Sequence, residues 1–335
     1  MRNRRSTGGF VISLDFELHW GVRDRRTIDQ YRDNLLGVRQ AIPAMLDLFA
    51  SNGLHATWAT VGFLFCESIE QLKASIPREL PAYRESALDP YAALSDVGRN
   101  EDDDPFHFAP SLIRRILACP GQEIATHTFS HFYALAHGPT LESFRADLRS
   151  AKSLANRYGI ELRSIVFPRN QISRLHLRIC ADEGLIAYRS TEADPLIEKL
   201  IETQSGFVRA LRLADSCFAL SGNGCATPRL DPEFPIVSVS GSRFLLPWSP
   251  ALQAFDNLRL RRICASMDAA ARSGTIFHLW WHPHNFGMHL DENMAFLARI
   301  VEHFACLNRK TGWPSLSMLE VAEQVMQAEK LHCPA

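Results

Sequence analysis

The sequence lacks the features that mark several large classes of protein. Its 335 residues carry a formal net charge of -1, so no excess of one sign points to a nucleic acid or an anionic membrane as a partner. No apolar run is long enough to span a bilayer, and no signal-peptide core follows the basic first five residues. We therefore expect a cytoplasmic protein without a membrane span.

The sequence also lacks a disulfide or zinc-ribbon pattern. None of its eight cysteines forms a C-x-x-C pair, and most lie in apolar surroundings. Internal repeats and low-complexity segments are missing as well. We therefore expect the cysteines to be reduced thiols buried in a globular protein.

What is present is a long alternation of strands and helices. Hydrophobic residues make up 46% of the chain and charged residues 22%, as in an ordinary globular enzyme. The alternation favours a parallel sheet with crossover helices, and its six or seven units favour a barrel over an open sheet. We expect a tail over 1–9, one barrel domain over 10–335 and a long surface insertion near 63–110. The pattern predicts a first strand from Phe10, further strands over 55–62, 122–126, 163–167, 185–188 and 275–281, and helices over 33–51, 111–118, 141–158, 175–183, 195–217, 252–272, 293–308 and 316–327.

Two carboxylates stand at the end of the first predicted strand. Asp15 and Glu17 are spaced i, i+2, so both side chains lie on the same side of that strand. Paired acids at the end of a buried strand are costly unless a cation or a proton compensates them. By spacing alone, either acid could bind a metal ion.

Two histidines follow the strand over 122–126. His127 and His131 are spaced i, i+4, and a helical turn would direct both imidazoles to the same ion. Two imidazoles and one carboxylate form a three-ligand site that leaves room for water and substrate. The pattern therefore predicts a catalytic metal site.

Two further strand ends carry polar groups. Arg169 and Asn170 follow the strand over 163–167, and an arginine beside a carboxylate keeps that acid ionised and oriented. His282 follows the last predicted strand and suits a general acid. Because the carboxyl ends of parallel strands share one face of a barrel, we expect all four clusters to meet there.

These residues resemble the successive motifs of the polysaccharide deacetylases, the NodB-homology group of carbohydrate esterase family 4. The order and relative spacing of the motifs match over roughly residues 10–287. The matching segments are Asp15-Phe16-Glu17, His127-Thr128-Phe129-Ser130-His131, Phe167-Pro168-Arg169-Asn170 and His282-Pro283.

The resemblance implies an irregular (β/α)7-type barrel and metal-dependent removal of acetyl groups from glycans, with Zn²⁺ as the expected ion. By resemblance, Asp15 matches the base and Glu17 the metal carboxylate. The same comparison makes Arg169 the residue that orients the base and His282 the general acid. The imidazole ligands it implies are His127 and His131.

This sequence departs from the family in its acidic pair and in its fourth motif. One residue separates the two acids, as in a divergent branch of the family. Trp248 is the only candidate for the fourth-motif tryptophan, and no aspartate is assigned to support His282. Residue type alone suggests that further side chains face the sugar, namely Trp20, Asn170, Trp248, His284 and Asn285.

The predicted substrate is an acetylated sugar or glycan precursor, with N-acetyl favoured over O-acetyl. Two alternatives stay open: an allantoinase-like hydrolase of a non-sugar C–N amide bond, and a catalytically inactive glycan-binding barrel. The complete set of base, ligands, arginine and acid argues against an inactive barrel, because binding alone requires none of them.

Overall fold

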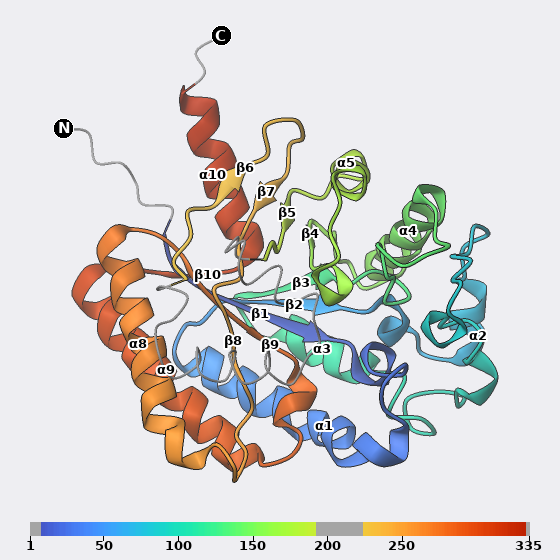
Figure 1. Ribbon diagram of the computed structural model, residues 1–335, viewed down its shortest axis with the longest axis horizontal. Helices are drawn as coiled ribbons and strands as arrows, with labels where there is room; N and C mark the ends of the chain where they lie inside the picture. The colour runs from blue at the N-terminus through green and yellow to red at the C-terminus, as the bar shows by residue number, and fades with distance from the viewer. Residues whose placement is uncertain (1–7, 192–223, 333–335) are drawn as a thin grey trace.

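The computed structural model describes residues 8–191 and 224–332 (Figure 1). Its strands are β1 (Phe10–Phe16), β2 (Ala56–Thr60), β3 (Gln122–Thr126), β4 (Ser164–Ile165), β5 (Ala187–Tyr188), β6 (Arg229–Leu230), β7 (Val237–Ser238), β8 (Arg243–Phe244), β9 (Phe277–Trp281) and β10 (Ser315–Leu316). They form one ten-stranded sheet in the order β6-β7-β5-β4-β3-β2-β1-β9-β8, with β10 paired to β1.

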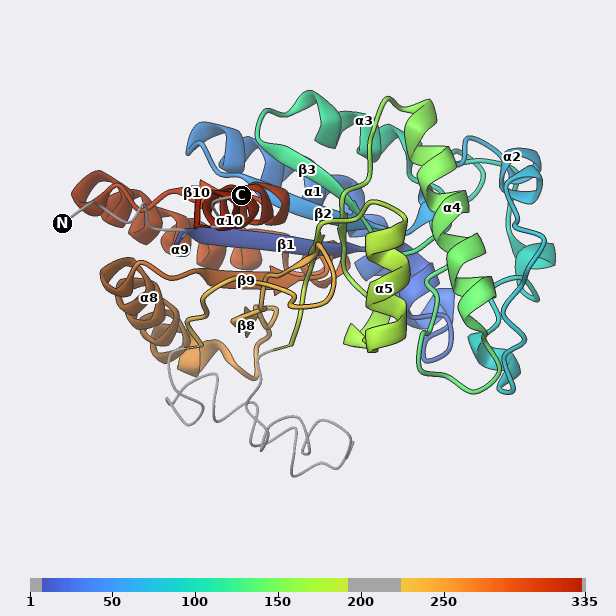
Figure 2. The same ribbon diagram turned by 90° about the horizontal axis from the view of Figure 1, so that it is seen from above.

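The sheet is parallel apart from β6, which runs antiparallel to β7. It curls into a half-barrel in which β1 lies between β2 and β9 (Figure 2). The predicted irregular α/β barrel of parallel strands is therefore confirmed. β6, β7, β8 and β10 were missing from the sequence prediction, and each contains only two residues.

Helices cover the outside of the sheet and fill one end of the barrel (Figures 1 and 2). They are α1 (Ile28–Ser51), α2 (Ile69–Ala74), α3 (Pro110–Ala118), α4 (Leu141–Arg157), α5 (Arg174–Asp182), α8 (Asp256–Ser273), α9 (Leu290–Thr311) and α10 (Met318–His332). α1 starts before the predicted Asp33 because Thr27 and Gln30 form a capping box at its N-terminus. The helix predicted over 195–217 lies outside the described residues.

Among the described residues, two apolar clusters form the core. The larger lies between the sheet and the outer helices, and the smaller lies inside the barrel. In the smaller cluster, Val11 of β1 and other small strand residues pack with Met318, Val321 and Val325 of α10. α10 therefore plugs one end of the barrel, and polar side chains collect at the other end.

The predicted insertion near 63–110 consists of α2, short helical turns and loops. It packs against η1 (Leu18–Gly21), the turn that follows Glu17. The backbone amide of His19 donates to Phe106 O at 3.2 Å, and Trp20 Nε1 donates to His107 O at 2.9 Å. The insertion thus fixes the turn next to the acidic pair.

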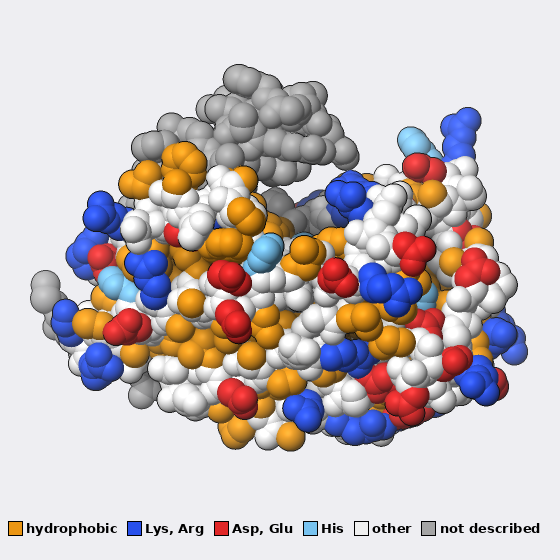
Figure 3. Space-filling view, turned by 90° about the horizontal axis from the view of Figure 1, so that it is seen from below, with side chains coloured by type: hydrophobic (Ala, Val, Ile, Leu, Met, Phe, Trp, Pro, Cys, Tyr) orange, Lys and Arg blue, Asp and Glu red, His pale blue; other side chains and the backbone are white. Residues whose placement is uncertain are grey.

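Side chains of both charges are interspersed over the face in Figure 3. This mixture agrees with the net charge of -1. Over residues 8–191 and 224–332, none of the helices has the length and apolar character needed to cross a membrane.

Candidate active site

The strand register brings three of the predicted polar clusters together at the carboxyl ends of the strands. Phe16 of β1 pairs with Thr60 of β2, which pairs with Thr126 of β3. On the other side, Leu14 pairs with Trp281 of β9. The residues that follow β1, β3 and β9 therefore leave the sheet at the same level.

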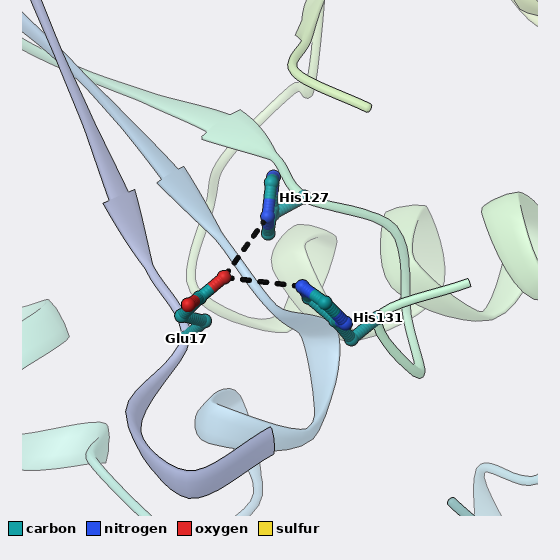
Figure 4. A group of neighbouring side chains, drawn as sticks. All are labelled: Glu17, His127 and His131. Carbon is teal, nitrogen blue, oxygen red and sulfur yellow. Dashed lines mark hydrogen bonds and ion pairs between the residues drawn. The ribbon is translucent and has the colours of Figure 1, made fainter. Parts of the chain in front are cut away.

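Glu17, His127 and His131 converge just beyond these strand ends (Figure 4). Glu17 Oε2 lies 3.3 Å from His127 Nε2 and 3.1 Å from His131 Nε2. All three residues are buried, with exposures of 4%, 1% and 2%. Their ligand atoms lie within 4.8 Å of one another, close enough to share one metal ion.

The loop that carries the two histidines is not the helical turn expected from their spacing. Thr128 and His131 adopt left-handed backbone angles, with φ of 65° and 58°. The loop is bound to α4 through Asp147, which accepts the amides of Phe129 at 2.7 Å and Ser130 at 3.2 Å. The convergence of the imidazoles therefore depends on a carboxylate from the next helix.

The tautomer of His127 is set by a backbone hydrogen bond. Its Nδ1 donates to Val166 O at 2.8 Å, because a carbonyl oxygen can only accept. In the neutral ring, Nε2 then presents its lone pair to Glu17. A hydrogen bond from the remote ring nitrogen is a frequent feature of metal-binding histidines.

Asp15 is paired with Arg189, and this corrects the predicted role of Arg169. Arg189 Nη1 donates to Asp15 Oδ1 at 2.6 Å, and its Nη2 donates to Oδ2 at 2.7 Å. Arg169 instead bonds Asp24 and lies 4.4 Å from the centre of the Tyr133 ring. Arg169 departs from the expected geometry because its backbone is left-handed, with φ of 54°.

Sequence reasoning missed Arg189, although a signal for it was present. It directly follows β5, so the strand-end rule that selected Arg169 applied equally to it. It is 1% exposed, and its guanidinium lies 4.2 Å from the centre of the Trp280 ring. Asn170 belongs to this group because its Oδ1 accepts from Arg189 Nη2 at 3.2 Å.

Both acids are held in their ionised form. Burial alone would raise the pKa of Asp15, but the charge and hydrogen bonds of Arg189 outweigh it and lower that pKa. Burial likewise opposes ionisation of Glu17, yet the charge of His282 and bonds from His127 and His131 hold its pKa well below the usual value. The site therefore concentrates two negative charges in a place with little water.

His282 faces both acids from the end of β9. Its Nε2 lies 3.8 Å from Asp15 Oδ2 and 3.6 Å from Glu17 Oε1. With 24% of its side chain exposed, it is more open to solvent than either acid, whose side chains are 5% exposed. An imidazole in this position can exchange a proton with a bound molecule.

The turn η7 (Pro283–Phe286) supports His282 and contains two of the predicted binding residues. His284 is 4% exposed and its ring is stacked 4.9 Å from that of His282. Burial lowers its pKa to about 3, so the ring is neutral. Asn285 Oδ1 accepts from Tyr31 at 3.4 Å, which connects the turn to α1.

The two predicted tryptophans lie elsewhere. The Trp20 side chain is fully buried against Phe63, at 4.6 Å between ring centres, so its predicted contact with a sugar is corrected. Trp248 packs its ring 4.8 Å from His289 at the start of α9. The tryptophan next to His282 is Trp280, at 6.1 Å.

Comparison with known proteins gives a fold but no sequence family. No family model matches the chain, and no curated protein matches it by sequence. Among solved structures, a protein from Mycobacterium smegmatis, provisionally described as a polysaccharide deacetylase, aligns with a TM-score of 0.62 at 13% identity, covering 98% of this chain and 93% of that one.

Two further structures align over almost the whole chain. One from Pseudomonas aeruginosa PAO1, also provisionally described as a polysaccharide deacetylase, gives a TM-score of 0.57 at 13% identity, covering 95% of this chain and 90% of that one. An allantoinase aligns with a TM-score of 0.53 at 12% identity, covering 96% of this chain and 91% of the allantoinase chain. The chain therefore has the fold of structures described as polysaccharide deacetylases and allantoinase.

Proposed function

We propose that this protein is a metal-dependent hydrolase that removes acetyl groups from a sugar or glycan precursor, with N-acetyl favoured over O-acetyl. We further propose that it is a divergent polysaccharide deacetylase with an Asp-x-Glu acidic pair. The shared fold supports this proposal, and the arrangement around Glu17 carries it.

The observation that carries the proposal is the set of atoms facing Glu17. Because His127 Nδ1 donates to Val166 O, the Nε2 of a neutral His127 ring carries its lone pair 3.3 Å from Glu17 Oε2. Burial lowers the pKa of His131 to about 4, so its ring is neutral near pH 7. Glu17 and the two imidazoles offer three buried ligand atoms within 4.8 Å of one another, and a cation between them would satisfy all three. The residues present therefore fit a divalent ion.

The donor set is one that zinc accepts. Two imidazole nitrogens and one carboxylate oxygen fill three tetrahedral positions and leave the fourth for water or substrate. When bound, the ion supplies a Lewis acid that polarises the acetyl carbonyl and acidifies a water. Glu17, His127 and His131 would hold it.

Asp15 is the proposed base. Its carboxylate is buried, ionised and held in one orientation by both terminal nitrogens of Arg189. A base must be free of its own proton and directed at the proton that it takes, and this pairing meets both conditions. Asp15 would accept the proton of the attacking water.

His282 is the proposed acid. It stands between the two carboxylates and the solvent-exposed side of the site, and it can give a proton to the departing amine or alcohol. Trp280 and Phe244 flank it, with ring centres 6.1 Å and 5.8 Å away. The ring of Phe244 suits the apolar face of a sugar, whereas Trp280 already packs on the guanidinium of Arg189.

A second candidate is hydrolysis of a non-sugar C–N amide, as suggested by the structural similarity to an allantoinase. The same base and acid would serve that reaction. The two proposals differ in the substrate, so an assay with both kinds of compound separates them.

The test measures acetate release by the zinc-loaded protein from an N-acetylglucosamine oligosaccharide and an O-acetylated xylan, with allantoin hydrolysis measured in parallel. Glu17→Gln is the matched control, because it keeps the shape of the side chain and removes the charge. The proposal expects acetate release by the wild type and none above background by Glu17→Gln. Allantoin turnover without acetate release would favour the second candidate, and equal activity of both proteins would refute the site.

A further inference from the structure

Behind Asp15, the interior of the barrel contains a chain of three buried polar side chains. Arg189 follows β5, Ser13 lies on β1 and His278 lies on β9, and their exposures are 1%, 0% and 0%. On the α10 side the same interior is apolar, with Val11 of β1 in the small core cluster. The polar chain therefore fills the layer between the apolar plug and Asp15.

The three side chains form a continuous hydrogen-bonded path. Arg189 Nη1 donates to Ser13 Oγ at 3.0 Å, and Ser13 Oγ lies 2.8 Å from His278 Nε2. The same Nη1 bonds Asp15, and Nη2 bonds Asp15 and Asn170. Four directed bonds and the ring of Trp280 at 4.2 Å thus define the plane of the guanidinium.

The direction of the Ser13 hydrogen bond follows from its neighbours. Arg189 has only donors, so Ser13 Oγ accepts from it. The hydroxyl hydrogen is then free to point to His278 Nε2 when that nitrogen carries no proton. Burial and the charge of Arg189 lower the pKa of His278 to about 3, in agreement with a neutral ring.

Packing alone does not explain this layer. The interior of a parallel barrel is usually filled by branched aliphatic side chains, and buried polar networks cost free energy unless each member is satisfied. A valine at position 13 and a leucine at position 278 would fill the space but leave one Arg189 N–H without an acceptor. Ser13 and His278 instead orient the Arg189 guanidinium. This orientation matters because a bidentate bond to a carboxylate requires the guanidinium and the carboxylate to be nearly coplanar.

We propose that Ser13 and His278 are positioning residues for the base: they hold Arg189 in the orientation that pairs both of its terminal nitrogens with Asp15. This inference rests on the proposed function, in which Asp15 is the base. Neither residue touches substrate, and both act through Arg189.

The first experiment does not depend on activity. NMR of zinc-loaded protein with ¹⁵N-labelled arginine and histidine measures rotation of the Arg189 guanidinium and the tautomer of His278. We expect slow rotation and a neutral His278 with its hydrogen on Nδ1 in the wild type, and faster rotation in Ser13→Ala. Equal rotation in both proteins, or a hydrogen on Nε2 of His278, would overturn the proposal.

The second experiment uses steady-state kinetics on the N-acetylglucosamine oligosaccharide. Ser13→Ala and His278→Leu should lower kcat by about 10- to 100-fold, since small misplacements of a reacting group have effects of this size. KM and zinc content should stay within about twofold of the wild type, because no ligand is disturbed. His278→Gln should recover most of the activity, since its amide oxygen can accept from Ser13.

Ser242→Ala is the matched control. Ser242 Oγ accepts the backbone amide of His278 at 2.9 Å, so this variant disturbs the same segment without breaking the side-chain path. An equal loss of kcat in Ser242→Ala and Ser13→Ala would mean that both variants act by disturbing the local structure, and it would refute the positioning role. A wild type that releases no acetate would refute the proposed function, whereas the NMR result would still decide the positioning of Arg189.

Discussion

Asp15 lies on β1 and Glu17 directly follows that strand, but the two acids face different partners. Asp15 meets a guanidinium at 2.6 Å, and Glu17 meets two imidazoles at 3.1 Å and 3.3 Å. A carboxylate already paired with arginine has little capacity left for a metal ion. The Glu17 carboxylate and the two imidazoles have ligand atoms within 4.8 Å of one another, so they are placed to share one ion.

The first prediction separates the two acids. Glu17→Gln should lose zinc and activity together, whereas Asp15→Asn should keep zinc and lose about two orders of magnitude or more in kcat, as for a missing base. Elemental analysis and kinetics on the same preparations measure both effects. Loss of zinc from Asp15→Asn with retention in Glu17→Gln would reverse the assignment.

The second prediction compares two arginines at neighbouring strand ends. Arg189→Lys should lower kcat by about 100-fold, because a lysine cannot make the bidentate bond to Asp15. Arg169→Lys is the control, since Arg169 bonds Asp24 rather than Asp15. A larger effect at Arg169 than at Arg189 in parallel kinetic measurements would restore the role that the sequence motif implied.

At the scale of elements, α4 holds the loop that carries the two histidines. Asp147 of α4 is fully buried and accepts two backbone amides and the hydroxyl of Ser130. Burial raises its pKa to about 7, against about 3.8 in the unfolded chain. The loop and the stability of the fold are therefore coupled to the protonation of one side chain.

The third prediction concerns this coupling. Between about pH 4 and pH 7 the unfolded chain loses the Asp147 proton while the folded protein keeps it, so the contribution of Asp147 to stability falls as pH rises. Asp147→Asn resembles the protonated acid and should remove this part of the pH dependence. Urea unfolding of both proteins across this range measures the difference, and parallel curves would contradict it.

A second element-scale contact fixes the turn after β9. Gly37 of α1 lies against Gly287 so closely that an added Cβ would be 2.2 Å from the Gly287 carbonyl oxygen. Asn34 of α1 also donates to His284 O at 3.0 Å. The position of His282 therefore depends on α1.

The fourth prediction is that Gly37→Ala destabilises the protein by about 1–3 kcal/mol and lowers kcat, with zinc binding retained. The ligands come from β1 and from the loop after β3, so they should not move with the turn. Gly53→Ala is the control, because an added Cβ there meets no atom within 4 Å and only its φ of 59° opposes the change. Thermal unfolding and kinetics test both variants. An unchanged kcat in Gly37→Ala would show that the position of His282 does not depend on this contact with α1.

At the scale of the whole molecule, the proposed ion would connect β1 with the loop after β3. A ligand that binds only the folded state stabilises it by about 2.7 kcal/mol when its concentration is 100 times Kd. The fifth prediction is that a chelator lowers the Tm of the wild type by a few degrees. His131→Ala should show no such shift, since two ligands make a weak site.

Differential scanning calorimetry with and without chelator tests this prediction. An equal shift in wild type and His131→Ala would mean that any stabilising ion lies elsewhere. For His131→Ala we expect a Tm that is lower than that of the ion-loaded wild type and that does not change when the chelator is added.

Much of the fold could be predicted from sequence because its main strands are buried on both sides. β1 and β9 appear as mainly apolar runs followed by polar residues, and the predicted bounds of β3, 122–126, agree with the structure. The two-residue strands carry too few side chains to produce a pattern. Their pairing depends on neighbours that are distant in the sequence.

The sequence by itself determined which residues stand at the carboxyl ends of the long strands, because alternation and burial act locally. Asp15, Glu17, His127, His131 and His282 were all found in this way. Only the tertiary structure decided which arginine meets Asp15. Arg169 and Arg189 both follow strands, but backbone conformation sends Arg169 to Asp24, while the curl of the sheet brings the end of β5 across the barrel to β1. Curvature and loop angles are set by the packing of the whole barrel, so no local pattern contains them.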